Sequence, residues 1–246
     1  MREEVKTNRA LWDALTSIHV ESKFYGLEEF KKGRCSLDPL EVEEVGDVKS
    51  RSLLHLQCHF GMDTLSWARR GAKATGMDFS APAIEKARAL AQELGLDARF
   101  LCCDVYDLPE HLGEQFDVVF TSAGVLCWLP DLPEWGRLVA RFVKPGGLFY
   151  LREFHPFVCC LDDRKGVEKP IVHYPYFRTS APLRFPGGED GDYADPDTVV
   201  TEDAVEWPYA LSSVIGALLD AGLRLESFRE FPWSSYKSLP YLEEDS

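Results

Sequence analysis

Apolar residues recur along this chain with two periods that alternate. Five short runs are almost wholly apolar, which is typical of strands buried on both faces of a sheet. Between them, apolar residues stand three or four positions apart, which is typical of helices. The predicted strands lie at 52–57, 73–77, 98–103, 116–121 and 148–152, and the predicted helices between them at 63–70, 80–95 and 135–143. Because such alternation favours right-handed crossovers, the pattern predicts a Rossmann-like, doubly wound, mostly parallel α/β sheet with helices on both faces.

Residues with capping and breaking preferences support these boundaries. Ser80 is suited to cap the helix that starts beside it, and Pro82 is favoured in a first helical turn. The run Lys144-Pro145-Gly146-Gly147 is a stop signal, so we expect the preceding helix to end there and the fifth strand to follow it.

The remaining segments complete a single domain. Residues 1–50 are predicted to be helical, with one helix-prone stretch from Asn8 to Gly33 and a short helix after Asp38-Pro39. Their aromatic residues either pack on the sheet or form a lid over a ligand site. Residues 51–155 form the predicted ligand-binding core, 156–205 break the alternation as an insertion on the substrate side, and 206–246 return to the sheet with a helix at 209–221 and a strand at 223–231.

Composition narrows the class of protein. The 246 residues carry a formal charge of −14, which argues against nucleic acid and anionic membranes as partners. The N-terminus lacks the apolar segment of a signal peptide, and no run of about 18 apolar residues predicts a membrane span. Seven cysteines without metal-binding spacing favour a reduced, cytoplasmic setting and no metal site. The sequence does not indicate an oligomeric state.

The segment from Leu53 to Gly61 is the predicted start of a ligand site. A strand, a small loop and a helix follow one another, and the carboxyl end of such a strand frames a crevice in open α/β sheets. A dinucleotide-binding loop requires several glycines to approach a pyrophosphate, whereas Gln57 and His59 occupy two of those places. Asp78 ends the next strand, where a ribose-binding carboxylate is expected.

These features, in this order, resemble the class I S-adenosylmethionine-dependent methyltransferases across roughly residues 50–155. The segment 55–61 lies where that family has acidic-x-Gly-x-Gly-x-Gly, and the loop Leu-His-Leu-Gln-Cys-His-Phe-Gly resembles that of one subgroup. The other matching features are Asp78-Phe79, Asp104-Val105, the segment 116–119 and the turn 144–147. S-adenosylmethionine carries no phosphate, so the resemblance is compatible with a loop that lacks glycines. His55 replaces the acidic first position and is either a ligand contact or a buried strand histidine.

The resemblance implies a cofactor site for S-adenosylmethionine, with S-adenosylhomocysteine as the product. Asp78 would bind the ribose hydroxyls and Phe79 the adenine; Asp104 would meet the adenine amino group, with Val105 donating its amide to the ring. Ser122 and Ala123 would border the sulfonium. The full set of expected cofactor residues is Gln57, Cys58, His59, Gly61, Asp78, Phe79, Cys103, Asp104, Val105, Ser122 and Ala123.

The methyl acceptor is less clearly indicated. Glu153 and His155 follow the fifth strand and are the first candidate catalytic bases, although His155-Pro156 could equally be a turn. His19 and Glu206 are further candidates, and some methyl transfers need no base. The segment after the fourth strand, 121–125, lacks the Asn/Asp-Pro-Pro-aromatic motif of methylases that act on nucleic-acid amino groups. The expected substrate or lid residues are Trp12, His19, Phe24, Tyr25 and Trp207. A second set of aromatic residues either forms the wall of a cavity for a small, partly apolar or cationic acceptor or packs the insertion onto the sheet: Tyr174, Tyr176, Phe177, Trp207 and Tyr209.

Three hypotheses follow. The first is a methyltransferase acting on a small molecule; the second is one acting on protein or RNA, which needs an open groove. The third is a protein that binds S-adenosylmethionine without transferring its methyl group. A nicotinamide-dependent reductase shares the fold class, but this chain lacks the glycines that such an enzyme needs to bind phosphate.

Overall fold

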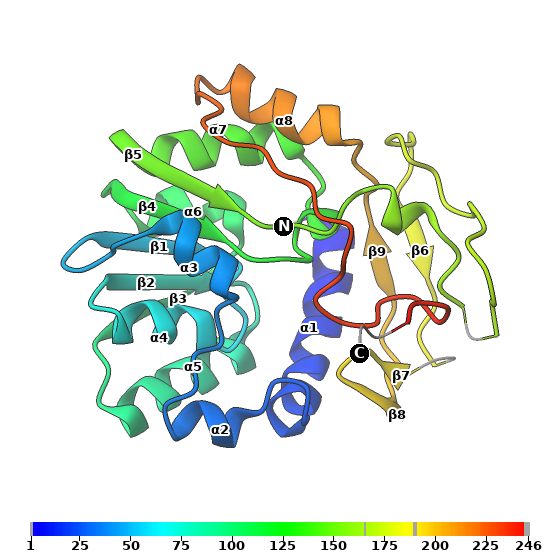
Figure 1. Ribbon diagram of the computed structural model, residues 1–246, viewed down its shortest axis with the longest axis horizontal. Coiled ribbons are helices and arrows are strands. Elements are labelled where there is room, and N and C mark those ends of the chain that lie inside the picture. Colours follow the sequence, from blue (N-terminus) through cyan, green and yellow to red (C-terminus); the bar gives the residue numbers. More distant parts are fainter. Residues whose placement is uncertain (1, 165, 189–190, 244–246) are drawn as a thin grey trace.

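The computed structural model, which describes residues 2–164, 166–188 and 191–243, has a central sheet with helices on both faces (Figure 1). The helices are α1 Glu3–Glu21, α2 Leu27–Lys31, α3 Pro39–Val45, α4 Met62–Arg69, α5 Ala81–Leu94, α6 Leu108–His111, α7 Leu132–Phe142 and α8 Leu211–Asp220, with 3-10 turns at Val105–Asp107, Leu126–Trp128 and Val158–Cys160. The strands are β1 Ser52–Leu56, β2 Lys73–Asp78, β3 Ala98–Cys102, β4 Phe116–Thr121, β5 Val143–Leu151, β6 Leu183–Phe185, β7 Gly191–Asp192, β8 Asp195–Val199 and β9 Ala204–Glu206.

The main sheet confirms the predicted α/β class. Its five strands run in the order β3-β2-β1-β4-β5, and every neighbouring pair is parallel. The order reverses at β1, so the carboxyl ends of β1 and β4 frame a crevice. Figure 1 shows α1 crossing the edge of the sheet at which the strands end, with the two small sheets beyond it. The N-terminal helix and the insertion therefore stand over the crevice.

Apolar packing fixes the helices on the two faces. On one face α6, α7 and α8 cover β1, β4 and β5, and α7 approaches α8 so closely that a Cβ on Gly136 would lie 2.5 Å from the carbonyl oxygen of Ala217. On the other face α3, α4 and α5 pack on β1 to β4 around the fully buried Trp67 and Phe100. These helices leave the carboxyl edge of the sheet to α1 and the insertion.

The N-terminal region and the insertion differ in detail from the predictions. The helix-prone stretch 8–33 is two helices, because Gly26 adopts a left-handed conformation (φ 59°) that ends the run before α2. The insertion forms two antiparallel two-stranded sheets, β6-β9 and β7-β8. Asn8 of α1 binds the main chain of β9 in both directions, with Nδ2 2.7 Å from the carbonyl oxygen of Val205 and Oδ1 2.9 Å from its amide.

Two expectations about the sheet edge need correction. The stop signal ends α7 as predicted, but 144–147 already belong to β5, which begins at Val143 and pairs through an irregular register with β4. The strand expected at 223–231 is absent: this segment is irregular and extended, and no sixth strand joins the main sheet within the described residues. Its apolar residues recur two or three positions apart, and a cavity separates the segment from β5, so it lacks the neighbouring edge that a strand needs.

Candidate active site

The loop after β1 keeps a glycine-type backbone without the glycines. Gln57 and His59 have φ values of 57° and 51°, in the left-handed region that costs a side-chain-bearing residue about 1–2 kcal/mol. At Gly61 (φ 81°) there is no room for a side chain, because a Cβ there would lie 2.8 Å from Ala87 and from Phe100. The loop therefore places two side-chain-bearing residues in a backbone conformation that glycine adopts without strain.

Hydrogen bonds from β2 hold this loop. The amide of Cys58 donates to the carbonyl oxygen of Met77 at 2.8 Å, and the amide of His59 donates to Asp78 Oδ2 at 2.8 Å. The other oxygen of Asp78 accepts from the amide of Ser80 at 2.9 Å. Burial raises the pKa of Asp78 to about 6, and these amides oppose the rise. A carboxylate in this place can still accept from ligand hydroxyls, since each of its oxygens has a second lone pair.

His55 is a buried strand histidine. Its side chain is hydrogen-bonded on both sides, with Nδ1 2.9 Å from Thr64 Oγ1 and Nε2 3.2 Å from Ser122 Oγ. Burial lowers the pKa of His55 to about 3, so the ring is neutral at physiological pH. In place of an acidic residue, the chain has a neutral group that joins β1, α4 and the end of β4.

One cavity of about 560 Å³ brings together the expected cofactor residues, with Cys103 as the exception, since it packs in the core behind the site. Asp104 lies at the wall, where Oδ1 accepts from the amide of Tyr106 at 3.0 Å. Burial raises the pKa of Asp104. The side-chain oxygen of Gln57 is buried without a hydrogen-bond partner among the described residues.

This donor set suits S-adenosylmethionine. The carboxylates of Asp78 and Asp104 suit hydroxyl and amino donors, and the free oxygen of Gln57 suits a further N–H donor. A charged cluster at the same cavity contains one guanidinium and three carboxyl groups: Arg152 pairs with Asp38 at 2.6 Å and with Glu41 at 3.2 Å, and Asp63 stands beside them. Burial raises the pKa of Glu41 to about 7 and also raises that of Asp63.

The expected lid residues divide between two places. Trp12, Phe24 and Tyr25 line the same cavity, and His19 is buried behind it, with Nδ1 2.9 Å from His59 Nε2. Trp207 does not line this cavity; it belongs to the core under α7 and lines a second cavity instead. Sequence reasoning missed the other aromatic residues of the wall, which no local pattern marks: Trp128, Phe154, Tyr193 and Tyr236.

The two candidate bases have different surroundings. Glu153 accepts hydrogen bonds from the amides of Gly124, Val125 and Leu126, and from that of Phe154. Burial raises the pKa of Glu153, and these amides oppose the rise. This arrangement favours a role in shaping the loop after β4. His155 lies outside the 560 Å³ cavity, with its side chain 37% exposed and paired with Glu230 at 2.6 Å.

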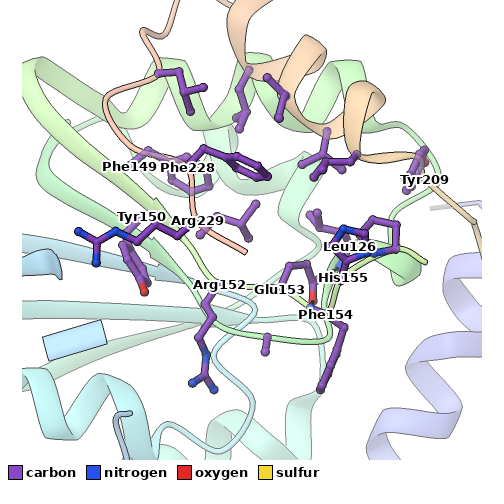
Figure 2. Close-up of a pocket in the computed structure, with 18 of the residues that line it drawn as sticks. Leu126, Phe149, Tyr150, Arg152, Glu153, Phe154, His155, Tyr209, Phe228 and Arg229 are labelled. Atoms are coloured by element: carbon purple, nitrogen blue, oxygen red, sulfur yellow. Dashed lines mark hydrogen bonds between the residues drawn. The ribbon is translucent and has the colours of Figure 1, made fainter. Parts of the chain in front are cut away.

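A second cavity, of about 1080 Å³, lies between β5, α8 and the extended segment 223–235 (Figure 2). Phe149 of β5 and Phe228 of the extended segment both line it, together with Glu153 and Phe154 (Figure 2). It takes the place that the expected sixth strand would have filled. Its surface is mainly apolar, although charged residues such as Glu44, Arg224 and Glu206 also line it. Burial raises the pKa of Glu206 to about 7.

Comparison with known proteins agrees with this geometry. Residues 53–147 match the family model described as methyltransferase domain. The ubiquinone biosynthesis O-methyltransferase of Alkalilimnicola ehrlichii is 32% identical over 124 residues, which are 47% of this chain and 50% of that protein. The protein of the same name from Klebsiella pneumoniae subsp. pneumoniae is 32% identical over 132 residues, 52% of this chain and 54% of that protein. The chain thus spans about half the length of the curated relatives it matches.

Solved structures share the fold. An S-adenosylmethionine-dependent methyltransferase from Mesorhizobium loti superimposes with a TM-score of 0.60 at 19% identity, covering 83% of this chain and 88% of the other. A putative one from Listeria monocytogenes gives a TM-score of 0.58 at 17% identity, covering 76% and 85%. The resemblance is therefore confirmed: residues 53–147 match a methyltransferase domain, and the chain has the fold of S-adenosylmethionine-dependent methyltransferases, a class whose cofactor is S-adenosylmethionine. No helix in the described ranges combines the length and apolar character needed to cross a membrane.

Proposed function

We propose that this chain transfers the methyl group of S-adenosylmethionine to a hydroxyl group on a small, ring-bearing, mainly apolar molecule. The observation that carries the proposal is the single cavity that joins the expected cofactor residues to an aromatic wall. Its volume of about 560 Å³ falls within the roughly 300–1,000 Å³ of pockets that enclose small ligands. The names of the curated relatives, which are O-methyltransferases of ubiquinone biosynthesis, support a hydroxyl acceptor.

The chain's own contribution would be binding, alignment and exclusion of water. When bound, the cofactor supplies an electrophilic methyl group on a sulfonium, so the protein has to align the acceptor with it. Gln57, Asp78 and Asp104 would hold the cofactor, and the rings of Trp12 and Trp128, which meet edge to face at 5.5 Å, would position an apolar acceptor.

A macromolecular acceptor fits the same cavity less well. The insertion closes over α1 and α2 through a hydrogen bond of 2.6 Å between the hydroxyls of Tyr25 and Tyr193, and Phe24 packs on Tyr193. An open groove for a protein or RNA chain would require these contacts to separate. The enclosed site therefore favours a small acceptor over the macromolecular alternative.

Two titrations and one screen test the proposal. Calorimetric titration should show binding of S-adenosylhomocysteine and none of NADH; the reverse result would exclude the methyltransferase assignment of the site. A screen that follows methyl transfer to phenols and catechols, with small amines and carboxylates alongside, should find turnover on the hydroxyl acceptors. Tight cofactor binding with no transfer to any acceptor would favour the third hypothesis, a binding protein without transferase activity.

A further inference from the structure

Three ionisable side chains from separate parts of the chain form one hydrogen-bonded row beside the cavity. Nε2 of His19 lies 2.9 Å from Asp192 Oδ1, and Nδ1 of the same ring lies 2.9 Å from His59 Nε2. His19 is fully buried, and the Asp192 side chain is 8% exposed. The row thus joins β7 of the insertion, helix α1 and the cofactor loop, and it ends in a residue that lines the cavity.

When both imidazoles are neutral, the ionised carboxylate at one end sets the direction of the hydrogen bonds in the row. An ionised carboxylate only accepts, so His19 carries its proton on Nε2 and presents a lone pair at Nδ1. His59 must then donate from Nε2, which leaves its Nδ1 as a bare lone pair. Nδ1 of His59 is buried and has no hydrogen-bond partner among the described residues. The row can therefore accept a hydrogen bond or a proton from a ligand at Nδ1 of His59.

Few of the side chains around the row can change their protonation state near neutral pH. Other titratable groups around it are Tyr25, Tyr193 and Tyr236 on the side of His19 and Asp192, and Asp78 beside His59. Burial raises the pKa of these tyrosines, so they stay neutral. Burial and the neighbouring His19 lower the pKa of His59.

His59 also adopts the strained left-handed backbone described above, at a place where a glycine would be free of strain. Strained residues persist where the surrounding structure and the function require their side chains. Trp12 packs edge to face on both His19 and His59, at 5.9 Å and 5.3 Å, so the row shares its aromatic wall with the proposed acceptor site.

We propose that Nδ1 of His59 accepts the proton of the acceptor hydroxyl and that His19 and Asp192 hold the resulting charge. The inference rests on the proposed function. The O–H bond breaks as the oxygen's electron pair forms the new O–CH₃ bond, and the C–S bond breaks with its pair remaining on sulfur. His59 takes the proton at Nδ1 and passes its Nε2 proton to Nδ1 of His19. The imidazolium then stands against the Asp192 carboxylate, and its proton returns to water after product release.

The tautomers can be measured without any turnover. Nitrogen NMR of ¹⁵N-labelled imidazoles in the protein saturated with S-adenosylhomocysteine should show His19 and His59 both protonated at Nε2, with Nδ1 bare. If Nδ1 of His59 carries a proton instead, it has no lone pair to accept the substrate's proton, and the inference is wrong.

Turnover of a phenol substrate tests the proton transfer itself. In His59→Asn the side chain cannot take the proton, while Asn tolerates the left-handed backbone better than other side chains. We expect kcat to fall at least about 100-fold, the scale of a lost general base, with the affinity for S-adenosylhomocysteine nearly unchanged. Asp192→Asn keeps an acceptor but removes the charge that stabilises the imidazolium, so the rising limb of the kcat–pH profile should move to lower pH.

Thr198→Ala is the matched control in the same hairpin. It removes the 2.7 Å hydrogen bond to Asp195 and leaves the row intact, so kcat and the pH limb should match those of the parent. Equal turnover by His59→Asn and the parent would overturn the relay while the proposed function stands. If the parent methylates no hydroxyl acceptor at all, the proposed function fails, and the relay's catalytic role fails with it whatever the tautomers are.

Discussion

The two loops that border the crevice, after β1 and after β4, are each held by one buried carboxylate from the end of a neighbouring strand. In the first loop Asp78 accepts from the amides of His59 and Ser80. In the second loop Glu153 accepts from four amides, those of residues 124–126 and 154. Asp78 therefore keeps capacity for a ligand, whereas the oxygens of Glu153 are occupied by the protein.

This difference shows how similar residues acquire different roles. Both carboxyl groups are buried acidic side chains beside one cavity, and burial raises the pKa of each. The number of backbone amides that reach each group decides whether it binds a ligand or shapes a loop. The candidate base Glu153 thus fits a positioning role, although its proposed catalytic role remains to be tested by substitution.

The largest effect is expected for Glu153→Gln. The N–H₂ of the new glutamine side chain would face backbone N–H donors, so that several buried N–H groups would lose their acceptor. We expect the free energy of unfolding to fall by about 3 kcal/mol, because hydrogen bonds to charged groups contribute about 1.5–3 kcal/mol each. Urea unfolding measures it. Glu230→Gln, at an exposed pair with His155, should change stability by less than about 0.5 kcal/mol. Equal effects of the two would contradict the comparison.

Asp78→Asn should weaken binding of S-adenosylhomocysteine by about 10- to 100-fold, since a carboxylate that accepts from ribose hydroxyls contributes about 1.5–3 kcal/mol. Calorimetry measures the affinity. Asp117→Asn is the contrast, because Asp117 binds the amide of Ser52 at 2.8 Å and Lys144 at 2.9 Å near the start of β4, away from the cavity. It should lower stability and leave the affinity intact. Loss of affinity in Asp117→Asn alone would place the cofactor elsewhere.

The pKa of Asp78, raised to about 6, predicts a pH dependence. Ligand binding favours the ionised form, so affinity for S-adenosylhomocysteine should fall below pH 6, by up to about tenfold between pH 6 and pH 5. The effect of Asp78 on the free energy of unfolding has the opposite sign. Its raised pKa stabilises the folded protein below pH about 4, the pKa of Asp in the unfolded chain, and this stabilisation is lost as the pH rises through about 6. In Asp78→Asn both dependences should flatten. A parent affinity that is constant from pH 5 to 8 would contradict this.

Gln57→Gly tests the strained backbone of the first loop. Glycine adopts the left-handed conformation freely. We therefore expect the free energy of unfolding to rise by about 0.5–1 kcal/mol, after allowing for the conformational entropy that glycine loses on folding. Gly61→Ala should do the opposite, because its Cβ would meet Ala87 and Phe100 at 2.8 Å. Thermal unfolding of the two variants measures both effects. Destabilisation by Gln57→Gly would show that the contacts of the Gln57 side chain stabilise the fold by more than the backbone strain costs.

His155→Ala should have the smallest effect. The ring lies outside the cavity of the cofactor residues, so kcat should stay within about twofold of the parent, far from the roughly 100-fold or more of a lost base. Initial rates with a phenol acceptor measure this. A 100-fold loss would instead support His155 as the catalytic base and would count against His59.

Local pattern determined the fold class, and the family resemblance supplied most of the residues that line the 560 Å³ cavity. The strands and helices between Ser52 and Leu151 follow from apolar periodicity, because that period has to match the element that buries it. Asp78 and Asp104 were found because residues at the carboxyl ends of parallel strands converge at a single edge.

Tertiary structure decided what depends on partners distant in the sequence. His55 became a buried link because Thr64 and Ser122 reach it, and the apolar pattern at 223–231 formed no strand because no paired edge lies beside it. The row of Asp192, His19 and His59 joins positions up to 173 residues apart. A sequence shows that a histidine is present, whereas only the folded chain determines which atom of its ring is left free to accept a proton.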